Sequence, residues 1–159
     1  MNYVFSSPDR VMVGTRGEVG ARLFLLQARE GRRLIVVKCE KQQLAALAQW
    51  LGVAITEMGR PGHLPEDLSL EPEYEPDLVM GDVSLAVDAE ARHVDVVIDG
   101  ADDEDQLLLT LSAEWAGALA IAIVRLIEAG RPPCPLCGGP LDARGHDCPR
   151  TNGHRAPLR

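Results

Sequence analysis

The sequence predicts an α+β fold, with a mostly antiparallel sheet and two helices built from two β-β-β-α units, followed by a C-terminal knuckle like a zinc ribbon. Three observations lead to this prediction. Short apolar or alternating segments are separated by turn residues, as is typical of paired strands. Two longer segments have apolar residues at the spacing of a helix face. Three of the four cysteines lie between residues 134 and 148, after the second helical segment.

The first half, residues 1–57, is expected to contain short strands and then one helix. Apolar segments predict strands at residues 3–5, 11–13, 23–28 and 34–37, with a glycine-containing turn between the last two. The helix is expected to open at Glu40, because the apolar residues that follow recur on one face of a helix. These residues are Leu44, Leu47, Ala48, Leu51 and Ile55.

Residues 58–77 are predicted to form an acidic connecting loop between two halves of a domain that spans residues 1–130. The segment contains four prolines, which are disfavoured in helix interiors and central strands. It also contains six acidic residues. We therefore expect neither a helix nor a strand in it.

The second half, residues 78–130, repeats the plan of the first. Alternating apolar residues predict strands at 83–87 and 94–98, and a third strand is expected at 107–111. Ser112 is a suitable N-cap for a helix that runs to about Ala129 and stops at Gly130. The strands at 34–37 and 107–110 lie 73 residues apart. Either a duplication or two occurrences of the common ββα plan would explain this pattern.

The second helix is apolar on every side between Trp115 and Val124. A helix of this kind must be covered on more than one side. We expect the sheet to cover one side, and the first helix or a second subunit to cover another, so a homo-oligomer is one expectation. Trp50 and Trp115, one on each helix, are expected to be core residues.

The charge of the chain is unevenly distributed. The formal net charge is -8, but residues 61–130 carry 17 acidic and 2 basic side chains, whereas both flanking segments are net basic. This excludes an evenly basic nucleic-acid binder, because polyanions are bound by clustered Lys and Arg. A hydrophobic content of 46% also excludes a disordered acidic chain. The acidic surface is expected to meet a basic partner.

The sequence favours a cytoplasmic protein without membrane contact. The N-terminal residues have no basic region followed by an apolar stretch, so no signal peptide is expected. The longest apolar run, Trp115–Val124, is shorter than the roughly 20 residues that span a bilayer. In a reducing compartment, clustered cysteines indicate a metal rather than disulfides.

Residues 131–159 are predicted to form a separate tail that resembles a small zinc ribbon. Cys134 and Cys137 in the run Cys-Pro-Leu-Cys-Gly place two thiolates on one tight turn, and a short hairpin can return Cys148 as a third ligand. Thr151 stands where a fourth cysteine would complete the zinc-ribbon pattern.

The fourth ligand of the predicted Zn²⁺ site is therefore open. We favour His146, because it lies inside the expected hairpin, and His154 is the alternative. Water, a partner residue or metal-free thiols are further possibilities. Four protein ligands would make the zinc structural, whereas a site in which neither histidine coordinates would leave an open, catalytic position.

A weaker signal is the run of glycines around Arg16 and Gly17. Together with His63, these residues are candidates for binding a small phosphorylated ligand in a pocket between the sheet and loop 58–77. The glycine spacing matches neither a P-loop nor a dinucleotide fingerprint. The alternative is a plain hairpin loop with a solvated histidine. No motif of a nucleophile beside a base is present, so no catalytic residue is assigned.

The tail also carries a set of arginines that suggests nucleic-acid contact. Because the tail has no aromatic residue for base stacking and the body is acidic, this reading is disfavoured. The arginines are Arg144, Arg150, Arg155 and Arg159.

Several motifs resemble an actinobacterial family catalogued as domain of unknown function 3090. They are Gly17-x-x-Gly20 to Gln27-Ala28-Arg29, Glu40-Lys41-Gln42-Gln43, Gly130-Arg131-Pro132-Pro133-Cys134-Pro135-Leu136-Cys137-Gly138, and Gly145-His146-x-Cys148-Pro149-Arg150-x-Asn152-Gly153. The resemblance covers nearly the whole chain. It implies a cytoplasmic protein of that lineage and implies no activity.

The first functional hypothesis is thus a non-catalytic protein-interaction or adaptor module with a structural zinc. The alternative is an enzyme or a protein that binds a small phosphorylated metabolite. A third hypothesis is nucleic-acid contact through the arginines of the tail.

Overall fold

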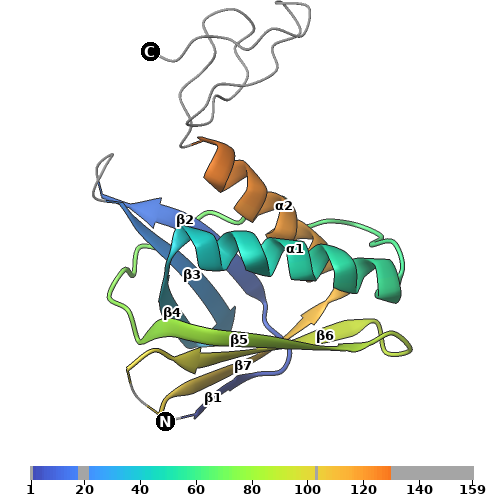
Figure 1. The fold of residues 1–159 in the computed structure, drawn as a ribbon, viewed down its shortest axis with the longest axis horizontal. Helices are drawn as coiled ribbons and strands as arrows, with labels where there is room; N and C mark the ends of the chain where they lie inside the picture. Colours follow the sequence, from blue (N-terminus) through green and yellow to red (C-terminus); the bar gives the residue numbers. More distant parts are fainter. Residues whose placement is uncertain (1, 18–21, 103, 130–159) are drawn as a thin grey trace, which may run out of the picture. The chain divides into compact units, whose positions relative to one another are not determined.

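The computed structural model describes residues 2–17, 22–102 and 104–129. The chain divides into two compact units, Met1–Val124 and Arg125–Arg159, and the sheet belongs to the first. The chain is α+β with two helices, as predicted, and the zinc-ribbon-like tail predicted at 131–159 lies outside the described residues. The elements are β1 (Asn2–Phe5), β2 (Arg10–Arg16), β3 (Leu23–Glu30), β4 (Arg33–Cys39), α1 (Lys41–Met58), β5 (Leu78–Asp88), β6 (His93–Gly100), β7 (Gln106–Ser112) and α2 (Ala113–Ala129) (Figure 1).

The seven strands form one sheet in the order β1-β7-β6-β5-β4-β3-β2. The prediction of a mostly antiparallel sheet is wrong, because the sheet is mixed. Strands β2, β3 and β4 pair antiparallel, as do β5, β6 and β7. However, β4 pairs parallel with β5, and β1 pairs parallel with β7. Both parallel pairs join segments that are distant in sequence, such as β4 and β5 on either side of α1 and its following loop.

The junction between β4 and β5 is short. Only Val37 with Leu78 and Lys38 with Val79 are in register, and β4 then ends at Cys39 as the chain turns into α1. The register of β5 against β6 shifts between Met80 and Val83. Beyond this irregularity β5 continues to Asp88 beside β6 alone, among the residues that the structure describes.

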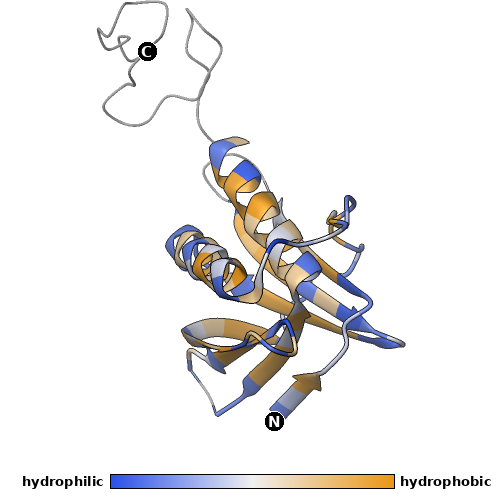
Figure 2. Ribbon diagram, turned by 90° about the vertical axis from the view of Figure 1, so that its right-hand side faces the viewer, coloured by the Kyte–Doolittle hydropathy of each residue, from blue (hydrophilic) through white to orange (hydrophobic). Residues whose placement is uncertain are grey.

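The main core lies between the sheet and the two helices, which lie on the same side of β5, β6 and β7 (Figures 1 and 2). Val94, Val96 and Ile98 of β6 are at most 1% exposed, and they alternate with more exposed residues. Each helix buries an apolar face that includes Leu44 and Leu51 of α1 and Leu119 and Ile123 of α2. Ile121 and Val124 of α2 remain exposed, so the expectation that a second subunit covers this helix stays a prediction.

The loop between α1 and β5 contains no helix or strand and packs against the sheet near β2 and β3. Gln27 of β3 is completely buried, and its side-chain amide donates to the main-chain oxygens of Glu71 and Glu73. The Gln27 side-chain oxygen accepts the Glu71 N–H at 2.8 Å. A Cβ atom on Gly14 of β2 would lie 2.8 Å from the side chain of Leu70, so this loop side chain packs directly on the strand.

Basic side chains of the first strands neutralise part of this acidic loop. The Arg29 guanidinium pairs with the Glu71 carboxylate, with 2.7 Å between Nε and Oε2. Arg10 faces Asp67 and donates to the main-chain oxygen of Ser69. The opposite charges of the first half and the connecting loop thus meet within one unit.

Candidate functional site

The predicted zinc ligands Cys134, Cys137, His146 and Cys148, and the alternative ligand His154, lie outside the described residues. The zinc site therefore stays a prediction. Within residues 2–17, 22–102 and 104–129, no group of three or more His, Cys, Asp or Glu side chains is placed to hold a metal ion.

The remaining cysteine, Cys39, lies in β4 and is 4% exposed. Burial raises the pKa of its thiol to about 12. A thiol with that pKa stays protonated at neutral pH, and the thiolate is the form that attacks electrophiles and binds metals. Cys39 is therefore a core residue.

The residues proposed for a phosphorylated ligand lie on separate segments. The Arg16 guanidinium stacks 3.9 Å above the ring of Tyr74, and Gly17 follows with a φ of 100°. His63 is exposed and lies between Gly62 and Leu64, both of which are close to α2. No hydrogen bond or ion pair described in the structure joins Arg16 to His63. A pocket shared by these residues stays a prediction.

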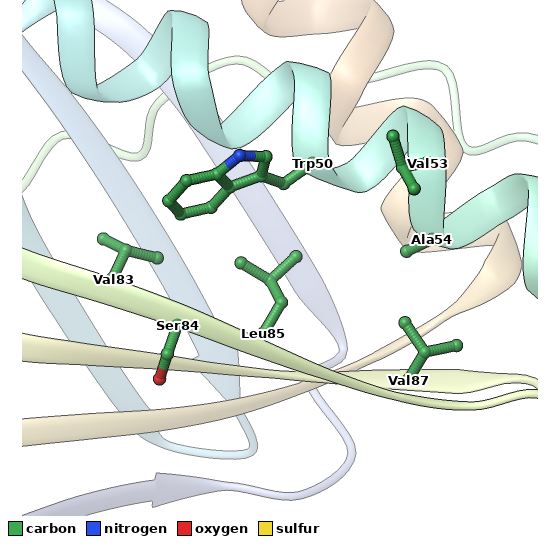
Figure 3. Close-up of a pocket in the computed structure, with 7 residues that line it drawn as sticks. All are labelled: Trp50, Val53, Ala54, Val83, Ser84, Leu85 and Val87. Atoms are coloured by element: carbon green, nitrogen blue, oxygen red, sulfur yellow. The ribbon is translucent and has the colours of Figure 1, made fainter.

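An apolar groove lies between α1 and β5, with a volume of about 360 Å³. We call it the α1–β5 groove. In Figure 3 the side chains of one helix face stand above Val83, Leu85 and Val87 of the strand, whereas the side chain of Ser84 points away from the helix. The lining residues are Trp50, Val53 and Ala54 of α1, and Val83, Ser84, Leu85 and Val87 of β5.

Polar contacts fix α1 above β5 at the start of the helix. The side-chain oxygen of Gln43 accepts the N–H of Glu40 at 2.9 Å, which caps the first turn. The side-chain nitrogen of the same residue donates to the main-chain oxygens of Met80 at 3.0 Å and Gly81 at 3.3 Å. One side chain therefore caps the start of α1 and holds the helix against β5 where β4 no longer pairs with β5.

The end of α1 is held by the hairpin between β5 and β6. Arg92 lies in this hairpin with a φ of 55°, and its guanidinium donates to the main-chain oxygens of Met58 and Arg60. A cation at this place also opposes the negative end of the helix dipole. Because α1 is fixed to β5 near both of its ends, the groove between them is a preformed feature of the fold.

The groove walls are apolar, and their exposure is high for such residues. Trp50 is 47% exposed and Val53 is 61% exposed. Val83, Leu85 and Val87 are half-buried, although their sheet partners Ile98, Val96 and Val94 are fully buried. The lining includes no titratable side chain, and Ser84 is its only polar residue. Such a site suits the binding of apolar groups and offers no acid, base or metal ligand for a reaction.

Sequence reasoning placed Trp50 in the core, and this expectation is wrong. The buried residues of α1 are Leu44, Leu47, Ala48, Leu51, Ala54 and Met58. Trp50 and Val53 lie beside this buried face of α1 and line the α1–β5 groove, next to the part of β5 that has no strand partner other than β6 among the described residues. The alternation of Val83, Leu85 and Val87 is visible in the sequence, but the loss of pairing with β4 is not.

Comparison with known proteins gives one match. A family model described as "Protein of unknown function (DUF3090)" matches residues 3–148 of the chain. Neither the curated proteins nor the solved structures contain a match. Among the described residues, neither helix is long and apolar enough to cross a membrane.

Proposed function

The chain belongs to the DUF3090 family of proteins of unknown function, and we propose from its own geometry that it is a non-catalytic protein-interaction module. The docking surface is the α1–β5 groove. The observation that carries the proposal is the exposure of Trp50 and Val53, 47% and 61%, above a preformed apolar groove. Clustered apolar side chains on a surface are typical of binding sites, and tryptophan is enriched among residues that dominate binding energy.

The absence of reactive groups in the lining supports docking over catalysis. General acid–base chemistry needs a titratable side chain within hydrogen-bond reach of the substrate. The described lining of the α1–β5 groove has no titratable side chain, and the hydroxyl of Ser84 points away from the helix (Figure 3). Docking of a protein segment through its apolar side chains requires only that the groove has a complementary shape and hydrophobic walls.

The proposal includes a structural zinc in the tail. Cys134, Cys137 and Cys148 would supply three ligands, and His146, or His154 in its place, would supply the fourth. The spacing of the cysteines supports this part of the proposal. A zinc ion held by four side chains would order a segment of 29 residues that is too short to build its own core.

Site-specific photo-crosslinking in the native cell tests the docking function. A benzophenone amino acid at position 53 should give a defined cross-linked product, and the same group at the exposed position 42 on α1 should not. The captured protein, once purified, should bind the wild-type chain about tenfold or more tightly than the Trp50→Ala variant. Equal affinity for both chains would contradict the proposal.

A further inference from the structure

We propose that the α1–β5 groove takes an extended peptide segment of another protein, which adds as a strand to the open edge of β5. This inference rests on the proposed function and names the class of its partner. The segment would have apolar residues at every second position and Lys or Arg at its ends.

Among the described residues, one edge of β5 is open along much of its length. Strand β4 pairs with β5 only at Leu78 and Val79, and Gln43 then occupies the carbonyls of Met80 and Gly81. From Asp82 to Asp88 the described residues supply pairing on one edge only, that of β6. A strand edge with free N–H and C=O groups is a template for another strand.

The α1–β5 groove and the open edge of β5 lie side by side. Figure 3 shows Val83, Leu85 and Val87 pointing toward the helix side chains that stand above the strand. Successive residues on one face of a strand are about 6.8 Å apart. A strand added to this edge would therefore carry its own alternate side chains on the same face, at the same spacing, under Trp50 and Val53.

The open edge of β5 is acidic at both of its ends. Asp82 and Asp88 stand at the two ends of this edge, and no basic residue occurs between Leu78 and Asp88. They belong to a segment, residues 61–130, that carries 17 acidic and 2 basic side chains. Lysine or arginine at the ends of the incoming segment would face these carboxylates, whereas acidic residues there would be repelled.

Charge also argues against a second copy of β5 as the occupant. Two β5 strands paired antiparallel about Leu85 would place Asp82 of one copy opposite Asp88 of the other at both ends. Like charges directly opposite each other in an antiparallel pair are destabilising. A basic peptide avoids this repulsion.

Selection from a phage-displayed library of random seven-residue peptides, with the full-length chain as bait, provides the probes. We expect the enriched peptides to alternate apolar residues and to carry Lys or Arg at their ends. Synthetic versions should bind the wild-type chain and the Ile121→Ser control equally, and should bind Trp50→Ala and Asp82→Lys about tenfold or more weakly. Asp102→Lys, a charge reversal at another exposed position, is the control for Asp82→Lys and should bind like wild type.

Two readouts distinguish strand addition from other modes of docking. N-methylation of alternate peptide amides should abolish binding for one set of positions and spare it for the other, because only one set faces β5. Amide hydrogen exchange at residues 82–88 should slow when the peptide binds.

Peptides that need Trp50 but bind as helices and leave residues 82–88 unprotected would overturn strand addition and leave the docking function standing. Concentration-dependent self-association that is lost in Trp50→Ala would assign the edge to a second copy and would also overturn it. If no selected peptide depends on Trp50, or none is enriched, the inference is wrong, whereas the proposed function is overturned only if the protein cross-linked from position 53 binds the wild-type chain and Trp50→Ala equally.

Discussion

The side-chain amide of Gln43 in α1 donates a hydrogen bond of 3.0 Å to the main-chain oxygen of Met80 in β5. This contact lies just after the last residues of β5 that pair with β4, and just after β4 ends and the chain enters the helix. The open edge of β5 and the groove above it begin just after Met80 and Gly81, whose main-chain oxygens bind the Gln43 amide.

Removal of the Gln43 amide should destabilise the fold. In Gln43→Ala the carbonyls of Met80 and Gly81 lose a donor, and the first turn of α1 loses one of the two hydrogen bonds of its capping box. We expect the free energy of unfolding to fall by about 1–3 kcal/mol. Urea denaturation measures this, with the exposed Gln42→Ala as the matched control, for which a change within about 0.5 kcal/mol is expected. Equal effects of the two substitutions would contradict the role given to Gln43.

Gln27 should be the strongest single link between the loop and the sheet. It is fully buried and makes three hydrogen bonds to the main chain of Glu71 and Glu73. Gln27→Leu keeps most of the side-chain volume but leaves these loop groups without their partner. We expect the free energy of unfolding, measured by urea denaturation, to fall by about 1–3 kcal/mol. We also expect proteolysis within residues 59–77 to become faster. A loop as protected as in the wild-type chain would show that Gln27 does not hold it.

The Arg29–Glu71 pair should make stability depend on pH. The hydrogen bond from Arg29 holds the pKa of the Glu71 carboxyl below its ordinary value of 4.5. A carboxyl whose pKa is lowered by folding stabilises the fold above its unfolded pKa, and this contribution is lost as the pH falls through the lowered pKa. In Glu71→Gln the free energy of unfolding should thus change less between neutral and acidic pH. Identical pH profiles for the two chains would contradict the pairing.

The zinc prediction concerns residues outside the described ranges and is tested on the full chain. Elemental analysis should find about one zinc ion per chain. Cys137→Ser should lose most of it, whereas Cys39→Ser should keep it, because Cys39 is buried in β4. Of His146→Ala and His154→Ala, the variant that loses zinc identifies the fourth ligand. Equal zinc content in Cys137→Ser and the wild-type chain would contradict the predicted zinc site.

The order of strands and helices could be predicted because each depends on a local pattern. The alternation at Val94, Val96 and Ile98, and the helical spacing from Leu44 to Leu51, are properties of single segments. The two parallel pairs could not be predicted in this way. Pairing of β4 with β5 depends on the path of the chain through α1 and the following loop. The pairing of β1 with β7 joins the first strand to the last, with all the other strands between them in the sequence.

The groove was missed for a related reason. A pattern of apolar residues indicates which side chains avoid water, but it does not indicate which strand edge lacks a neighbour. Trp50 was therefore assigned to the core as a large apolar residue on a helix, although it lies above the part of β5 that no longer pairs with β4 after Val79. The Arg29–Glu71 ion pair was not predicted either, because the sequence shows that basic and acidic segments occur but not which of their side chains meet.

Docking at the α1–β5 groove is the central claim, and the most direct test is the dissociation constant of the protein cross-linked from position 53. It should be measured by calorimetry against the wild-type chain and Trp50→Ala, after circular dichroism has shown that both are folded. We predict that Trp50→Ala binds about tenfold or more weakly, because the ring loses its buried contacts with the partner. A dissociation constant that is the same for both chains would contradict the claim.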